Sequence, residues 1–153
     1  MTTLSDAAKV GVDELLQSDE DQLYEELGIR SRAIAGNVAV SASFMPAITA
    51  NEIQAMGAMD EVKKLGRRIF QRWNREAYHL LCGTEAEDEK DRSELRAAFG
   101  IGRSAVAATL TGMLVSSFGL APAIAAVIAA LFIKRFFQGA YEETCAFWKA
   151  QLA

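Results

Sequence analysis

The longest uncharged stretch of the chain predicts the centre of the fold. Residues 104–133 contain no charged side chain, whereas Arg103 precedes the stretch and Lys134 follows it. Gly119 favours the end of one helix, and Pro122 is well tolerated in the first turn of the next. The pattern therefore predicts a helical hairpin, with one helix before Gly119 and a second helix after Pro122.

The composition of this hairpin favours burial inside protein. Nine of the thirty residues in 104–133 are alanine, and small side chains let helices approach closely. Each predicted helix is about 20 Å long at 1.5 Å per residue, which is too short for a hydrocarbon layer about 30 Å thick. The turn at 118–121 has no polar side chain, so a wedge that stops inside a bilayer would leave backbone groups unpaired. We expect a protein core, and insertion into a membrane is the alternative.

Acidic helices are predicted over residues 1–28. Ser5 can cap a first short helix, and Ser18 can cap a second one that ends at Gly28. Both helices have only a narrow apolar stripe, so we expect them to cover one end of a larger body.

Residues 33–82 combine a small-residue segment with the longest amphipathic helix. The uncharged segment 33–45 has some strand-like alternation, but the chain has no second segment of this kind with which a sheet could form. We therefore expect a helix that ends before Pro46. Thr49 and Glu52 form a capping box, which opens a helix predicted to run unbroken from 50 to 82 and to pack against the hairpin.

The remainder of the chain contains one polar segment and a long last helix. Residues 84–93 predict a solvated loop or the polar first turns of a helix that ends near Phe99. In residues 94–153 the second helix of the hairpin continues past Tyr141 to the end of the chain, because its apolar stripe is continuous. The sequence thus predicts one all-α, single-domain helical bundle over residues 1–153, built around the apolar, alanine-rich hairpin.

Charge is segregated along the chain. Residues 1–27 contain one lysine against eight acidic residues, and residues 28–83 contain eight basic against four acidic residues. Such blocks more often pair within a fold than form a surface for polyanions. We therefore interpret the basic face of the long helix as solvated and internally paired, with anionic lipid or nucleic acid as less favoured partners; this face consists of Lys64, Arg68, Arg72 and Arg75.

Metal and thiol chemistry have few candidates. Glu76, His79 and Cys82 follow one another at helical i, i+3 spacing and form a candidate metal site, but His79 is the only histidine of the chain. We expect no metal and no cofactor. The first residues lack the basic start and apolar core of a signal peptide, so we expect a cytoplasmic protein with Cys82 and Cys145 as reduced thiols.

Function has to be inferred without a catalytic motif. No arrangement of a nucleophile with a base stands out, and no phosphate-binding loop is present. We expect a non-enzymatic helical interaction or assembly module that acts through self-association or a protein partner, because Phe136, Phe137 and Trp148 spread around more than one side of the last helix. The alternative is a membrane-active or membrane-anchored protein that inserts residues 104–133 into a bilayer, with a location at the inner membrane.

Overall fold

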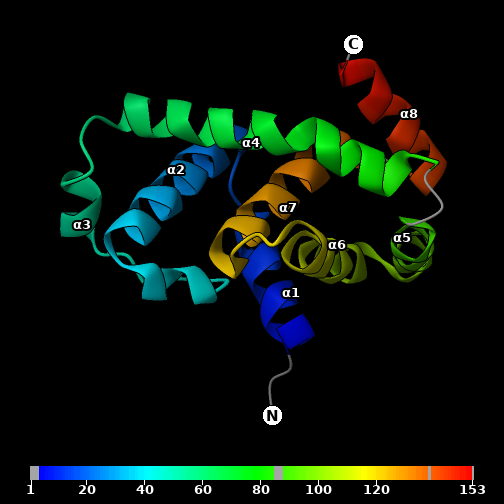
Figure 1. Ribbon diagram of the computed structural model, residues 1–153, viewed down its shortest axis with the longest axis horizontal. Helices are drawn as coiled ribbons and strands as arrows, with labels where there is room; N and C mark the ends of the chain where they lie inside the picture. Colours follow the sequence, from blue (N-terminus) through cyan, green and yellow to red (C-terminus); the bar gives the residue numbers. More distant parts are fainter. Residues whose placement is uncertain (1–3, 85–87, 138, 153) are drawn as a thin grey trace.

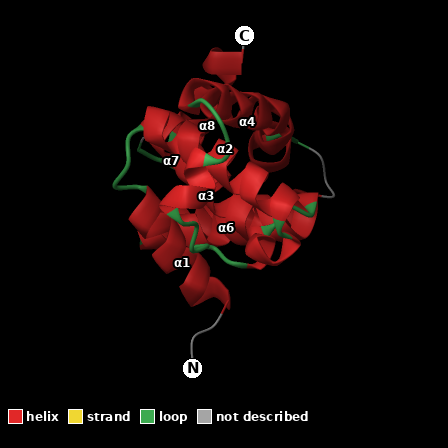
Figure 2. Ribbon diagram, turned by 90° about the vertical axis from the view of Figure 1, so that its left-hand side faces the viewer, coloured by secondary structure: helices red, strands yellow, loops and turns green. Residues whose placement is uncertain are grey.

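The protein is an all-α helical bundle, as the sequence predicts. The computed structural model describes residues 4–84, 88–137 and 139–152. Within these ranges the chain forms eight α-helices and one short 3₁₀ helix, η1, and no strand (Figures 1 and 2). The elements are α1 (Leu4–Leu15), α2 (Glu20–Gly36), η1 (Val38–Ala42), α3 (Ala50–Gln54), α4 (Met59–Cys82), α5 (Glu89–Ile101), α6 (Arg103–Phe118), α7 (Pro122–Phe136) and α8 (Tyr141–Leu152).

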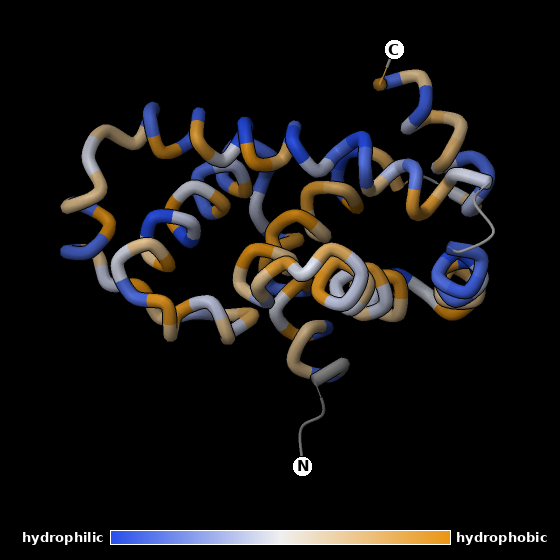
Figure 3. The backbone as a smooth tube through the Cα atoms, viewed as in Figure 1, coloured by the Kyte–Doolittle hydropathy of each residue, from blue (hydrophilic) through white to orange (hydrophobic). Residues whose placement is uncertain are grey.

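Helix α7 lies at the centre of the bundle. It contacts α1, α2, α6, α8 and η1, and every residue from Ala125 to Phe132 is 0% exposed. Alanines along α7 let its neighbours approach closely, while Ile128 and Phe132 fill the space between them. In Figure 3 this helix is the mainly hydrophobic tube in the middle of the molecule.

Helix α6 precedes α7, and the chain between the two helices is non-helical from Gly119 up to Pro122, as predicted. Gly119 adopts a left-handed conformation with φ of 66° after α6 ends, and Pro122 occupies the first turn of α7. The N–H of Leu120 donates to the carbonyl oxygen of Leu114 at 3.2 Å, which satisfies one of the last carbonyls of α6. Unlike α7, α6 has an outward side, on which Gly112 and Ser116 are exposed. Only the second half of the apolar stretch therefore occupies the centre.

Helices α2 and α4 form a close backbone contact. A Cβ atom added to Gly28 would lie 2.0 Å from the carbonyl oxygen of Val62, and one added to Gly66 would lie 1.9 Å from that of Tyr24. The expectation that Gly28 ends the acidic helix is wrong, because α2 continues to Gly36. Gly28 instead provides the space in which α4 crosses α2.

The position of α2 also differs from the prediction. We expected acidic helices that cover one end, but α2 packs between α4 and α7, with Leu23 and Leu27 fully buried. Its N-cap is Asp19 rather than Ser18: the Asp19 side chain accepts from the N–H of Gln22, and the Gln22 side chain accepts from the N–H of Asp19. The long helix α4 therefore packs mainly against α2. It contacts α7 through the ring of Phe70, whose centroid lies 5.2 Å from that of the Phe132 ring.

Arg30 fixes the segment that follows α2. A single helix over 33–45 is wrong, since α2 ends at Gly36 and is followed by η1 and extended chain. The guanidinium of Arg30 is buried; its Nη1 donates to the carbonyl oxygens of Phe44 and Ala123, each at 2.9 Å, and its Nε donates to Glu26 at 2.8 Å. Burial lowers the pKa of Arg30 from its ordinary value, which Glu26 partly offsets. Arg30 thereby joins α2, the loop and α7.

The predicted helix over 50–82 is interrupted. Thr49 caps it as expected, since its hydroxyl accepts from the N–H of Glu52 at 3.1 Å. However, α3 ends at Gln54, Gly57 adopts a φ of 96°, and a new helix, α4, begins at Met59. A positive φ of this kind stops a helix, and glycine adopts it without a steric penalty.

The predicted long last helix is also two helices. α7 ends at Phe136, Gly139 has a φ of 67°, and α8 begins at Tyr141 at an angle of 93° to α7. The chain then returns toward the end of α4 (Figure 1). Of the polar segment 84–93, residues 85–87 lie outside the described ranges, and α5 begins at Glu89.

Candidate functional site

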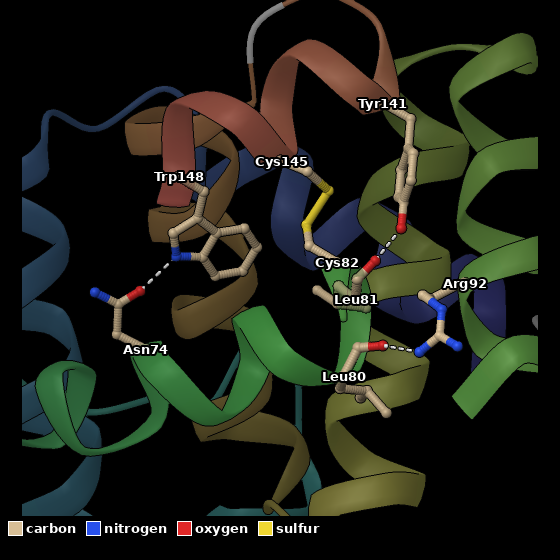
Figure 4. The surroundings of a disulfide bond; sticks show 8 residues. All are labelled: Asn74, Leu80, Leu81, Cys82, Arg92, Tyr141, Cys145 and Trp148. Carbon is tan, nitrogen blue, oxygen red and sulfur yellow. Dashed lines mark hydrogen bonds between the residues drawn. A yellow bond between two sulfur atoms is a disulfide. The ribbon is translucent and has the colours of Figure 1, made fainter. Parts of the chain in front are cut away.

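A disulfide joins the last residue of α4 to α8. The sulfur atoms of Cys82 and Cys145 are 2.03 Å apart and the Cα atoms 5.6 Å apart. Figure 4 shows the bond between the two helices, with Tyr141 and Trp148 on either side of Cys145. The expectation of reduced thiols is wrong for this structure, because the turn before Tyr141 folds α8 back onto α4.

The same junction satisfies carbonyl groups at the end of α4. The hydroxyl of Tyr141 donates to the carbonyl oxygen of Leu81, and Nη1 of Arg92, on α5, donates to that of Leu80 at 3.5 Å (Figure 4). The last carbonyls of a helix have no partner within the helix, so side chains from other elements can pair with them. Burial raises the pKa of Tyr141 above its ordinary value. The disulfide and these hydrogen bonds thus hold the end of α4 against α5 and α8.

The candidate metal site is not assembled. Glu76 and His79 are exposed on α4, whereas the sulfur of Cys82 is bonded to Cys145. A disulfide sulfur is not the thiolate that binds metals, so the inclusion of Cys82 in the candidate site is wrong. In the ranges that the structure describes, no group of three histidine, cysteine or acidic residues could hold a metal ion.

The aromatic side chains of the last two helices pack inside the chain. Phe136 and Trp148 are 0% exposed, and their rings stack with centroids 4.9 Å apart and an interplanar angle of 8°. The indole Nε1 of Trp148 donates to Oδ1 of Asn74 at 2.8 Å (Figure 4). Phe137 is half-buried against Phe99. The prediction that these aromatics are exposed interaction residues is therefore wrong, because α8 folds back over the end of α7.

The basic side of α4 is exposed, as predicted. Asp21 on α2 pairs with Lys63 at 3.2 Å and with Arg67 at 3.3 Å, so one acidic residue of the N-terminal block does pair with the basic block. Lys64 pairs with Glu61 at 3.4 Å within the helix.

The other members of this face have no carboxylate partner within residues 4–84, 88–137 and 139–152. Arg72 lies over the ring of Trp73 at 5.2 Å, Arg75 donates to the backbone carbonyl of Leu152 at 3.4 Å, and Arg68 has no polar partner among the described residues. The interpretation of a fully paired face thus holds for only part of it. Surface pairs of this kind contribute about 0–1 kcal/mol each.

A groove lies over the outward side of α6 and was not predicted. Its volume is about 600 Å³. Its floor is a helical stripe of small side chains on α6, and its walls come from α1, the loop before α3 and α5. The residues that line it are Ala8, Phe44, Asp91, Glu94, Ala108, Thr109, Gly112, Met113, Val115 and Ser116.

The floor of the groove is open and one of its walls is acidic. A Cβ atom added to Gly112 would meet no atom within 4 Å. Asp91 accepts from the hydroxyl of Ser117 at 3.0 Å, and Glu94 is exposed without a polar partner in the described part of the chain. Spacing alone could have placed Ala108, Gly112 and Ser116 on one side of α6, but only the packing of α1 and α5 leaves that side uncovered.

The length and hydropathy of a helix decide whether it can cross a membrane. Among the described residues, no single helix is long and apolar enough to cross a membrane. Counted together, the bent pair α7 and α8 is long and apolar enough, by length and composition only.

The fold and its surfaces define a class, an all-α bundle with a buried central helix and an open groove on its neighbour. Comparison with known proteins finds no match: no family model, no curated protein and no solved structure is similar to the chain.

Proposed function

We propose that this protein is a non-enzymatic helical interaction module, which binds a basic, amphipathic helix of a protein partner in the groove over α6. The observation that carries the proposal is the uncovered stripe of small residues on α6, between α1 and α5. Helices commonly dock in apolar grooves through residues spaced three and four apart. Small residues on the floor allow close approach of the partner backbone, as they do between helices elsewhere.

The charge of the groove supports the choice of partner. The described residues that line it include two carboxylates, Asp91 and Glu94, and no basic side chain. Complementary charge favours a partner with lysine or arginine beside its apolar stripe and disfavours an acidic one. A second copy of this chain fits less well, because the apolar side of its basic helix α4 is already packed on α2. Self-association remains an alternative outcome of the test below.

Gly112 allows the groove to be blocked without loss of the fold. Gly112→Leu places a side chain in open space, and replacement of glycine within a helix also favours helix formation by up to about 1 kcal/mol. Gly100→Leu is the matched control, since Gly100 lies within α5, is equally open and does not line the groove. Both variants should retain the circular dichroism spectrum of the wild type.

The probe is a designed helical peptide of alanine and leucine with lysines beside its apolar stripe. We expect calorimetry to detect binding to the wild type and to Gly100→Leu, and an affinity at least tenfold lower for Gly112→Leu. Equal binding to Gly112→Leu, equal binding of a peptide with glutamates in place of the lysines, or no binding at all would contradict the proposal. Wild-type dimers that Gly112→Leu abolishes, seen in sedimentation, would instead identify a second copy as the occupant.

Membrane insertion of residues 104–133 is the alternative proposal and is supported by composition alone. It requires α7 to leave the contacts that bury it with α1, α2 and α6. A cytoplasmic location stays a prediction, and the disulfide between Cys82 and Cys145 does not favour it, because disulfides are rare in that compartment. Recovery of the protein only in a membrane pellet that resists high salt would support the alternative.

A further inference from the structure

A second cavity lies at the opposite end of α6, where that helix begins beside the end of α7. Its volume is about 440 Å³, which falls in the range of small-molecule sites. The lining residues come from α5, α6, α7 and the turn after α7: Phe99, Gly102, Arg103, Val106, Ile133, Lys134, Phe137 and Gly139. None of them lines the groove proposed above.

The cavity has two uncompensated cations. Arg103 and Lys134 both line it, and neither has a hydrogen bond or an ion pair in the described ranges. Among the described residues the lining contains no acidic side chain. Two carboxylates lie outside it: Asp13 accepts from the hydroxyl of Ser104 at 3.3 Å, and Glu143 approaches the backbone of Gly139. A cationic ligand is therefore disfavoured at this site, and an anionic group is favoured.

The remaining lining is apolar. The rings of Phe99 and Phe137 lie with centroids 5.4 Å apart and an interplanar angle of 36°, and Val106 and Ile133 are buried beside them. Ligand sites typically combine such apolar walls with a few polar groups that orient the ligand. The arrangement suits a molecule with one charged end and an apolar body.

We propose that this cavity binds a small amphiphilic carboxylate, with the carboxylate at Arg103 and Lys134 and the apolar body against Phe99 and Phe137. The planar guanidinium of arginine pairs with a carboxylate through two parallel hydrogen bonds. This assignment does not depend on the function proposed for the groove.

The test compares three probes that separate the two halves of the ligand. Octanoate carries both the charge and the chain, 1-octanol carries only the chain, and acetate carries only the charge. We expect octanoate to bind the wild-type protein at least tenfold more tightly than either of the others, in calorimetry at low salt. Nuclear magnetic resonance should show shifts in the backbone amides of Gly102 and Phe137 on addition of octanoate.

Variants locate the site. Arg103→Gln and Lys134→Gln should each lower the octanoate affinity by about tenfold, which corresponds to loss of one charge-assisted hydrogen bond. Arg68→Gln is the matched control, because Arg68 is an exposed arginine on α4 without a polar partner in the described chain. It should leave the affinity unchanged. Octanol or acetate binding as tightly as octanoate, an equal loss in Arg68→Gln, or no octanoate binding would each overturn the proposal.

Discussion

Helices α6 and α7 come from one uncharged stretch, yet α7 is buried on all sides and α6 is exposed to solvent on one side. Both are rich in alanine. α7 is surrounded by helices, and its residues Ala125 to Phe132 are 0% exposed, whereas α6 buries one side and leaves Gly112 and Ser116 open. Hydrophobic composition thus identifies segments that require a packing partner, but it does not specify how many sides of the helix are covered. Substitutions in the two helices and in their neighbours would show whether this difference in burial holds.

A charge should be tolerated on α6 and not on α7. Ala126→Lys places a charge in a fully buried position of α7, which costs several kcal/mol against a total stability of about 5–15 kcal/mol. We expect Ala126→Lys to be unfolded by circular dichroism. Ser116→Lys, at an exposed position of α6, should change the unfolding free energy by less than about 0.5 kcal/mol. A folded Ala126→Lys protein would contradict the burial of α7.

Loss of the disulfide between α4 and α8 should lower the stability of the protein and increase local opening of α8 and the end of α7. The bond closes a separation of 63 residues, for which the chain-entropy estimate gives about 4 kcal/mol of stabilisation. We expect replacement of both Cys82 and Cys145 by serine to lower the unfolding free energy by about this amount in urea titrations. Hydrogen exchange should increase more in α8 and the end of α7 than in α6. An unchanged midpoint would show that the bond does not form.

Two helical glycines should respond in opposite directions to alanine. Gly66→Ala brings a Cβ atom to 1.9 Å from the backbone oxygen of Tyr24, and such overpacking typically costs about 1–3 kcal/mol. Gly112→Ala meets no atom within 4 Å and should stabilise the protein by up to about 1 kcal/mol through helix propensity. The thermal unfolding midpoint should fall in Gly66→Ala and rise in Gly112→Ala. Equal effects would contradict the close contact between α2 and α4.

The smallest effect concerns alkaline pH. Burial raises the pKa of Tyr24 above its ordinary value of 10.0, although Arg135, on α7, donates to its hydroxyl at 2.8 Å and opposes the shift. A pKa raised in the folded state gives stability that is present below pH 10 and is lost as the pH rises through the folded value. We expect Tyr24→Phe to reduce the loss of stability above pH 10, as measured by urea unfolding at several pH values. A steeper loss of unfolding free energy in Tyr24→Phe than in the wild type would contradict the raised pKa of Tyr24.

Features that depend on nearby residues could be predicted from the sequence. Thr49 caps a helix through Glu52 because both groups lie within one turn. Gly119 and Pro122 separate α6 from α7 because their backbone preferences act locally. The all-α class follows from many such signals together. The exposure of the basic side of α4 was predictable for the same reason, since helical spacing places its members together.

Only the tertiary structure decided which sides of the helices are covered. Gly28 has the conformational freedom to stop a helix, but the approach of α4 makes it a contact within a continuous α2. Phe136 and Trp148 are buried because the chain turns back after α7, and the same turn brings Cys145 to Cys82. The groove over α6 is a space between elements far apart in sequence, and the cavity at the start of α6 is a space between the ends of α5 and α7. Local preferences determine where helices begin and end, whereas burial depends on contacts that form only when distant segments meet.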